Sequence, residues 1–228
     1  MSNILYDELT LLYHPNLFEY KSVGGIVTIN EHEQNAMVKF AEMCYHGKLL
    51  SIKNDLLKDC HKIYKENESN SPELKHDCDG IFFLTCQEKK YFILIELKSK
   101  YNKTNLEKAE KQLAASYIRV LSRLSCLKDF DINRYKVCGI IVSQGPTTAE
   151  RTKADKKRKT KQRLDRYEKQ MMTFCKGDTP FELNHQFVHT HQLPIREDLL
   201  FDKLPIFHID CNGSSVRFEL APILNKLE

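Results

Sequence analysis

Runs of apolar residues separated by short polar segments predict strands at several places along the chain. The segment SVGGIVTIN at 22–30 predicts a turn followed by a short strand. The runs GIFFLTC at 80–86 and YFILIEL at 91–97 are almost wholly apolar, and only the segment QEKK separates them. Because that connection is short and polar, the two runs predict a β-hairpin, and their continuous apolar character predicts strands covered on both faces.

Apolar residues at spacings of three and four predict helices in the first third of the chain. One helix is expected from Glu31 to about Tyr45 and another at about 49–66, since each segment places its apolar residues on one helical face. Gly47 lies between them and is expected to end the first helix. The segment KENESNSPEL at 65–74 is polar and contains a proline, so it predicts a loop.

The rest of the chain continues the alternation of helices and strands. A long helix is expected from a cap at Asn102 or Thr104 to about Leu124, because its apolar positions keep a period of 3.6. The remaining predicted elements are a strand at 135–143, a helix at about 148–173, and short strands at 204–209 and 215–220. No internal repeat and no domain-scale linker interrupts the pattern, so we expect one α/β domain.

Composition narrows the class of protein. The 228 residues are 41% hydrophobic and 29% charged, which is enough apolar material for a core and too much for a chain disordered throughout. No apolar run approaches the roughly 20 residues of a membrane-spanning helix, and the N-terminus carries acids where a signal peptide carries basic residues. We therefore expect a cytoplasmic protein. Its eight cysteines form no CxxC pair, which argues against a zinc finger or a thioredoxin-like redox motif.

Positive charge is concentrated in one segment. Residues 151–166 contain nine Lys or Arg and two Asp, a formal charge of +7, whereas the whole chain carries only +4. A basic block on a nearly neutral body fits the phosphate backbone of a nucleic acid, although a solvated helix that binds nothing has the same pattern. The residues that we assign to nucleic-acid binding are Lys153, Lys156, Lys157, Arg158, Lys159, Lys161 and Arg163.

Three polar residues stand at the ends of the predicted hairpin strands. Asp79 comes directly before the first strand, and Glu96 and Lys98 end the second. Alternate residues of a strand point to the same face, and antiparallel pairing brings Asp79 beside Glu96, so all three side chains can converge. Two carboxylates at such a point predict a site for a hard divalent cation, Mg²⁺ above all. A lysine beside them can position an attacking water and offset charge on a phosphate.

Asp79, Glu96 and Lys98 form a D…ExK pattern that resembles the signature of the PD-(D/E)XK nucleases, the restriction-endonuclease-like superfamily. In that family the motif spans a hairpin of a mixed central sheet flanked by helices, and a helix and a further strand follow it. Cys78 stands where the family name has a proline. The resemblance covers a core at about 31–143, and we expect a single nuclease domain over 1–228 that contains it. The basic helix at about 148–173, the N-terminal addition and the C-terminal extension at 174–228 have no counterpart in the resemblance.

The resemblance also bears on two helical residues. Gln112 and Tyr117 follow the hairpin at nearly the spacing of a glutamine–tyrosine pair in one branch of the family, but one residue too far apart, so only Gln112 is carried over. It would orient the lysine, the water or the substrate backbone. Many members add an acid from the helix before the sheet. Glu33 falls on the inward face of the helix expected there and Glu42 about half a turn away, so Glu33 is the expected additional metal ligand.

The resemblance implies a Mg²⁺-dependent nuclease, with Mn²⁺ as a substitute, that hydrolyses phosphodiester bonds in DNA, while RNA stays open as a substrate. Asp79 and Glu96 would hold the metal, and Lys98 would act on the nucleophile. Compact prokaryotic members imply a role in restriction or anti-phage defence, with a homodimer or a regulatory partner protein. The rival class is a catalytically silent nucleic-acid-binding or assembly subunit of the same fold.

Other kinds of site have weaker support. His185, His189 and His191 have no suitably spaced acid or cysteine, so their segment predicts a surface strand or loop in preference to a zinc site. Ser143 lacks the Gly-x-Ser-x-Gly pattern of a serine hydrolase. The chain also lacks the GxxxxGK[ST] pattern of a P-loop, so we do not expect it to hydrolyse nucleoside triphosphates in that way.

Overall fold

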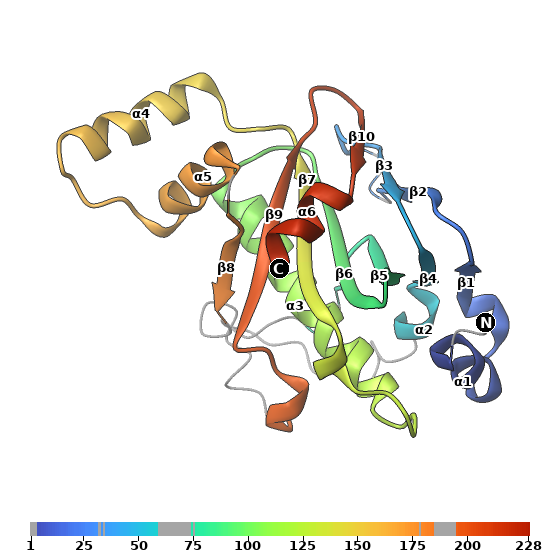
Figure 1. Ribbon diagram of the computed structural model, residues 1–228. Helices are drawn as coiled ribbons and strands as arrows, with labels where there is room; N and C mark the ends of the chain where they lie inside the picture. The colour runs from blue at the N-terminus through green and yellow to red at the C-terminus, as the bar shows by residue number, and fades with distance from the viewer. Residues whose placement is uncertain are drawn as a thin grey trace.

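A seven-stranded mixed β-sheet forms the centre of the computed structural model (Figure 1). The structure describes residues 4–31, 33, 35–58, 74, 76–177, 179–184 and 195–228. In spatial order the strands of this large sheet are β1 (Phe18–Lys21), β4 (Lys48–Ile52), β5 (Gly80–Cys86), β6 (Lys89–Lys98), β7 (Lys136–Ser143), β9 (Lys203–Asp210) and β8 (Phe181–Asn184). Strands β6, β7 and β9 run parallel to one another, and the other neighbours pair antiparallel.

A smaller sheet packs on one face of the large one. Its three strands are, in spatial order, β10 (Ser215–Glu219), β3 (Phe40–Tyr45) and β2 (Gly25–Asn30). One apolar cluster joins Met43 of the small sheet to Ile93 and Ile95 of β6, and the short helix α6 (Ala221–Leu224) adds to the same cluster. Each sheet therefore buries one apolar face against the other sheet.

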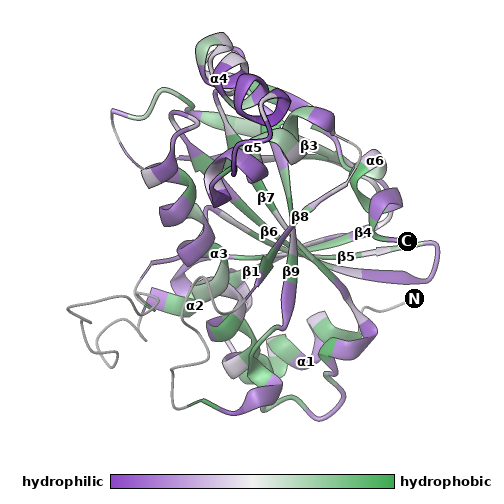
Figure 2. Cartoon of the chain, turned by 90° about the vertical axis from the view of Figure 1, so that its left-hand side faces the viewer, coloured by the Kyte–Doolittle hydropathy of each residue, from purple (hydrophilic) through white to green (hydrophobic). Residues whose placement is uncertain are grey.

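Helices cover the opposite face of the large sheet, as Figure 2 shows for α3 (Lys103–Leu124). Successive residues of a strand point to opposite faces, and in β6 this divides Phe92 and Leu94, which pack with α3, from Ile93 and Ile95. Both faces are thus buried, which explains the continuous apolar run in the sequence. The other α-helices are α1 (Ile4–Leu12), α2 (Asp55–Lys58), α4 (Thr148–Lys159) and α5 (Arg166–Lys176).

The architecture confirms the predicted α/β class, with a large mixed sheet flanked by helices. The hairpin is confirmed as β5 and β6, and the strands expected at 22–30, 135–143, 204–209 and 215–220 are present as β2, β7, β9 and β10. Of the two caps considered for the long helix, Asn102 is the one used, since its side chain accepts a hydrogen bond from the Asn105 N–H at 2.8 Å.

The helices predicted at 31–45 and 49–66 are wrong. Residues 40–45 form β3 and residues 48–52 form β4, and Gly47 turns the chain between them with a φ of +103°. Pairing with two neighbouring strands buries alternate residues of β3, such as Ala41 and Met43, which no single helical face would do. Strand β4 lies inside the large sheet, where both faces are apolar. Tertiary pairing therefore overrides the local spacing. Of the second segment, 59–66 lies outside the described residues.

The basic helix predicted at 148–173 is two helices. Helix α4 ends at Lys159, Lys161 has a φ of 56°, and α5 begins after Asp165. Asp165 and Glu168 form a capping box, in which each side chain accepts a hydrogen bond from the other residue's backbone N–H. That D-x-x-E pattern is visible in the sequence and explains the break. Figure 1 shows α4 projecting from the body of the molecule and α5 returning to it.

Some predicted segments lie outside the described residues, and some strands of the large sheet lie outside the predicted core. The predicted loop at 65–74 lies, except for Leu74, outside the described residues, and so do His185, His189 and His191. Strands β1, β8 and β9 belong to the large sheet although they lie outside residues 31–143. Within the described ranges, no helix is long and apolar enough to cross a membrane.

Candidate active site

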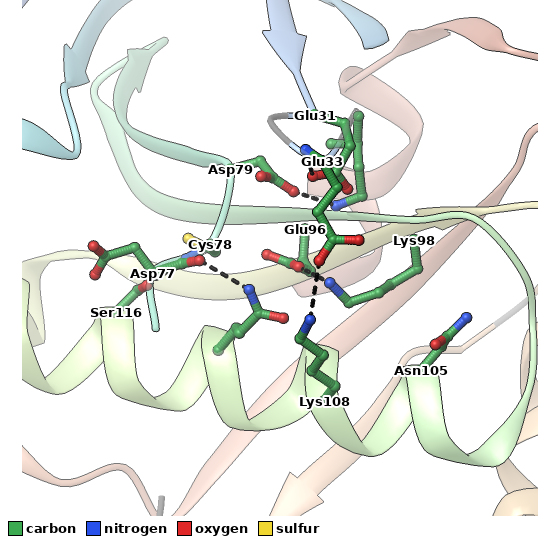
Figure 3. A network of polar contacts seen from close by, with 12 residues as sticks. Glu31, Glu33, Asp77, Cys78, Asp79, Glu96, Lys98, Asn105, Lys108 and Ser116 are labelled. Carbon is green, nitrogen blue, oxygen red and sulfur yellow. Dashed lines mark hydrogen bonds and ion pairs between the residues drawn. The ribbon is translucent and has the colours of Figure 1, made fainter. Parts of the chain in front are cut away.

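The register of the β-hairpin brings the first acid beside the second. Gly80 pairs with Ile95 in the antiparallel β5–β6 ladder, so Asp79 lies level with Glu96, and Lys98 is two residues further along the same face. Figure 3 shows the side chains of Asp79, Glu96 and Lys98 gathered at this end of the sheet, above α3. The convergence that the hairpin predicts is therefore present.

Asp79 is fixed by the strand that it faces. Its Oδ2 accepts a hydrogen bond of 2.8 Å from the backbone N–H of Leu97. Leu97 belongs to β6, but β5 does not extend far enough to pair with it. The carboxylate thus continues the ladder by one bond. Gly80, the first residue of β5, lets the ring of Phe82 approach the backbone, because a Cβ at Gly80 would lie 2.6 Å from that ring. These contacts hold the Asp79 carboxylate at the edge of the site.

Three successive turns of α3 hold the segment before Asp79. Gln112 Nε2 donates to the carbonyl of Asp77 at 3.0 Å, and Ser116 Oγ accepts from the Cys78 N–H at 2.8 Å. Arg119, which is 1% exposed, forms an ion pair with the carboxylate of Asp77. The carboxylate of Asp77 is therefore engaged with Arg119.

Gln112 therefore acts on Asp79 through the backbone. Its Nε2 is used by Asp77, so the expectation that Gln112 orients Lys98, a water or the substrate has no contact behind it in the described structure. Its Oε1 is buried and has no hydrogen-bond partner among the described residues. Tyr117, the other half of the family pair, is a core residue whose ring lies 5.9 Å from that of Phe92.

Glu96 and Lys98 form a buried ion pair. Glu96 is 1% exposed and Lys98 7%, and Lys98 Nζ contacts Oε1 of Glu96. The second oxygen of Glu96, Oε2, is buried without a hydrogen-bond partner among the residues that the structure describes. A buried carboxylate oxygen normally has a partner, so this atom is a vacant acceptor next to a lysine.

Burial disfavours the charged form of both acids of the site. Burial raises the pKa of Asp79 to about 7, against the bond from Leu97, which lowers it. Burial raises the pKa of Glu96 well above its usual range, and the charge of Asp79 adds to that shift. Burial alone would lower the pKa of Lys98, but the charge and hydrogen bond of Glu96 raise it, so the ammonium stays protonated. A positive ion between the two acids would offset this cost.

Two further acids approach from the β2–β3 connection. Glu33 does not lie on a helix, so the helical face from which it was expected is wrong. Its charge nevertheless raises the pKa of Asp79, and the charge of Lys98 lowers the pKa of Glu33. Glu31 accepts a hydrogen bond of 3.0 Å from the Glu33 N–H, and its charge raises the pKa of Glu96. Glu42 lies on β3, paired with Thr28. Figure 3 shows Glu31 and Glu33 on the side of Glu96 opposite α3.

Sequence reasoning missed Glu31 and Lys108. Lys108 Nζ lies 3.1 Å from Glu33 Oε1 and reaches the site from α3. A signal for Lys108 was present, because it precedes Gln112 by four residues and so shares a face of the helix with it. Glu31 had no such signal, since its place depends on a connection that was assigned to a helix.

The site opens toward a pocket of about 280 Å³ that lies between the two sheets. Asp79 borders it, together with polar residues of β2 and of the turn after β4, among them Thr28, Asn30 and Asn54. Asn54 also donates to the carbonyl of Cys78 at 3.0 Å and so joins this wall to the Asp79 segment. A polar molecule can thus approach Asp79 from the surface.

The basic segment is anchored to the helix that borders the site. Arg166 of α5 lies 2.7 Å from Glu110 of α3, and Gln170 donates to the same carboxylate at 2.8 Å. Lys157 is half-buried in an ion pair with Glu168, so its charge is already used. The other residues assigned to nucleic-acid binding are exposed: Lys153, Lys156, Arg158, Lys159, Lys161 and Arg163. Of these, Arg158 lies 3.7 Å from Asp155.

The donor set suits a hard cation that keeps much of its water. The described residues contain no group of three or more His, Cys, Asp and Glu placed to hold a metal, so they form no transition-metal cage. Mg²⁺ is usually bound by one or two carboxylates and several waters. Asp79 and Glu96, with the vacant Oε2 of Glu96, fit that requirement.

The raised pKa of Asp79 predicts a pH-dependent effect of Asp79→Asn in EDTA. A carboxyl group whose pKa is higher in the folded state stabilises the fold fully below its unfolded pKa, near 4, and loses that contribution as pH rises through about 7. Asn keeps the acceptor for Leu97 and does not ionise. We expect it to raise the melting temperature at pH 8 by roughly 2–6 °C, for about 1–2 kcal/mol, and to have little effect at pH 4.

Thermal unfolding followed by circular dichroism at both pH values measures this difference. Glu107→Gln, which removes an exposed acid from α3, is the control and should give the same small change at pH 4 and pH 8. An Asp79→Asn effect of equal size at both pH values would show that the carboxyl group is not desolvated as described.

Comparison with known proteins adds no relative: no protein-family model, no curated protein and no solved structure matches the chain.

Proposed function

We propose that the protein is a Mg²⁺-dependent nuclease of the restriction-endonuclease-like fold that hydrolyses phosphodiester bonds, with DNA as its substrate. One observation carries the proposal: Asp79, Glu96 and Lys98 converge at one end of a hairpin, and Glu96 Oε2 is buried there without a partner in the described structure. The order of hairpin, helix α3 and parallel strand β7 agrees with the D…ExK pattern.

Asp79 and Glu96 would hold the cation, with Glu33 as the additional ligand that the resemblance implies, and the charges of Glu33 and Glu31 both act on Asp79. When bound there, Mg²⁺ supplies a Lewis acid that lowers the pKa of a coordinated water and offsets phosphate charge, and Mn²⁺ has the same preferences. Burial of both carboxylates favours this binding, because a cation would offset the cost of charging each of them away from water.

Lys98 would act chiefly through its charge. Its pKa is raised by Glu96, so it does not readily give up its proton, and its N–H groups can donate to a phosphate oxygen or to the attacking water. The 7% exposure of Lys98 places that charge where water is scarce and its effect on a developing negative charge is large. Gln112 acts as a positioning residue, because it fixes the backbone that leads to Asp79.

The exposed cations of α4 and the following turn would bind phosphates on either side of the cut. Helix α4 projects from the body (Figure 1), and α5 ties it to α3 through Glu110, so a nucleic acid held on α4 lies next to the helix that borders the site. From the family resemblance we also propose a role in restriction or anti-phage defence, as a homodimer or with a regulatory partner.

A catalytically silent nucleic-acid-binding or assembly subunit is the second candidate. It is favoured by the near-complete burial of Glu96 and by its ion pair with Lys98, which engages both groups with each other. In that case the pair would only stabilise the end of the sheet, and the basic segment alone would carry the function.

Plasmid cleavage and DNA binding together separate the two candidates. Purified protein with 10 mM-scale Mg²⁺ should convert supercoiled plasmid to nicked and linear forms, and EDTA should abolish conversion. In parallel, Lys156, Lys159 and Lys161 changed together to Gln should weaken duplex binding and reduce the salt slope by up to about 3. The control changes Lys89, Lys136 and Lys203, which begin β6, β7 and β9 at the end of these strands away from Lys98; Lys89 and Lys203 are ion-paired with Glu228 and Glu182. Binding without cleavage would exclude the nuclease and favour the silent subunit.

A further inference from the structure

Lys108 is a cation of the site that the nuclease chemistry above does not use. It lies on α3 one turn before Gln112, and its side chain is 47% exposed. Its ammonium is 3.1 Å from Glu33 Oε1, and the Glu33 side chain is itself 66% exposed. Figure 3 shows this pair extending from α3 toward the acids, with Lys98 alongside. The pair therefore joins opposite sides of the site at its solvent-facing edge.

The partner of Lys108 is held among the charges of the site. The charge and hydrogen bond of Lys108 lower the pKa of Glu33, and the charge of Lys98 acts in the same direction. The connection that carries Glu33 is attached beside Lys98, because the Met37 N–H donates to Ser99 Oγ at 2.8 Å. Glu33 thus lies on a connection that is attached beside Lys98, and its charge acts on Asp79.

We propose that Lys108 is a substrate-binding residue that a divalent cation makes available. In the cation-free protein Lys108 neutralises Glu33, and when a cation occupies the acids it takes over the charge of Glu33 and frees the Lys108 ammonium to bind a phosphate of the nucleic acid. The inference rests on the proposed function, since it needs the cation at Asp79 and Glu96. It adds a coupling between cation and substrate that the ExK pattern does not contain.

The physical basis is the weakness of the existing pair. Both side chains are well exposed, and ion pairs of that kind contribute little because water and salt compete for both charges. A divalent cation beside Glu33 attracts the carboxylate more strongly than one ammonium does. A phosphate is then the best remaining partner for Lys108, because a lysine on a flexible stem binds phosphate as a point charge. By linkage, nucleic acid must also tighten cation binding by the same factor.

Fluorescence anisotropy of a labelled DNA duplex tests the proposal by affinity. Binding is measured in EDTA and in Ca²⁺, a hard cation for carboxylate sites, with a gel to verify that the DNA is intact. Ca²⁺ should tighten binding by wild-type protein, and Lys108→Gln should reduce that gain, taken as the ratio of each protein's own affinities in Ca²⁺ and in EDTA, by about five- to tenfold. Lys103→Gln is the matched control, because Lys103 is on the same helix, is 71% exposed and should not alter the gain.

A second set of variants removes Glu33, the acid that pairs with Lys108, and keeps Lys108 itself. Glu33→Gln should tighten DNA binding in EDTA, because it frees Lys108, and Glu33→Gln combined with Lys108→Gln should lose that gain. Glu107→Gln makes the same change of charge on α3 and shows how much comes from net charge alone. If the double variant keeps the full gain of Glu33→Gln, Lys108 does not bind the DNA and the proposal is overturned.

The two hypotheses fail in different ways. An equal Ca²⁺ gain for wild type and Lys108→Gln overturns the role of Lys108 and leaves the nuclease proposal standing. Mn²⁺ binding, followed by the electron paramagnetic resonance of free Mn²⁺, reports on the cation site without any activity. If wild-type protein binds no Mn²⁺, the cation-dependent nuclease fails and the coupling proposed here fails with it.

Discussion

Glu96→Gln and Lys98→Met should each reduce Mg²⁺-dependent plasmid cleavage by about 10²–10³-fold, the loss typical when one preorganised charge is taken from a dry site. Gln has the shape of Glu without its charge, so it offers the cation a much weaker ligand. Met keeps the length of Lys98 and removes the ammonium that would face the phosphate. The measurement is the initial rate of loss of supercoiled plasmid at fixed enzyme concentration.

Folding must be checked beside activity, because each substitution leaves the other charge buried at a cost of about 3–5 kcal/mol. The double variant Glu96→Gln with Lys98→Met removes both charges and should recover much of that stability while staying inactive. Glu42→Gln is the matched control, since Glu42 lies on β3 of the other sheet and should cleave like wild type. Cleavage by the double variant at the wild-type rate would refute the assignment.

The largest effect on stability is expected at Arg119, where Arg119→Met should lower the free energy of unfolding by about 3–5 kcal/mol. Arg119 of α3 is 1% exposed and has two partners: it pairs with the Asp77 carboxylate and donates to the carbonyl of Leu57 in α2. Without it the Asp77 carboxylate, whose side chain is 8% exposed, would be left in the interior with its charge uncompensated. Urea unfolding followed by circular dichroism gives the change.

A double-variant cycle distinguishes the ion pair from simple loss of packing. Asp77→Asn combined with Arg119→Met should be more stable than Arg119→Met alone, because no charge is then left buried. Lys111→Met, a half-exposed position on the same helix, serves as the control and should change the unfolding free energy by less than about 0.5 kcal/mol. A loss below about 1 kcal/mol for Arg119→Met would mean that Arg119 reaches water.

The central part of the fold could be predicted because its signals are local. The hairpin β5–β6 follows from two apolar runs joined by a short polar turn, and α3 follows from its period and from the cap at Asn102. Strands β3 and β4 could not be predicted in that way. Their apolar residues happen to fall at helical spacings, and only pairing with β2, β10, β1 and β5 decides their conformation.

The candidate site shows the same division. Asp79, Glu96 and Lys98 were brought together by strand geometry alone, since pairing and alternation fix where such residues point. Glu31, Glu33 and Lys108 depend on how the β2–β3 connection crosses the end of the sheet, which no local pattern encodes. The bond from Gln112 to Asp77 likewise needs the packing of α3 on the sheet.

The placement of β9 and β10 has a consequence for how the chain folds during its synthesis. Strand β9 lies between β7 and β8 in the large sheet, and β10 pairs with β3 in the small one, so residues 203–219 complete both sheets. While the ribosome is still making them, β3 and β7 each have one unpaired edge, and the chain cannot close its core. Chaperones that shield exposed strand edges would thus bind this chain until residues 203–219 have been made.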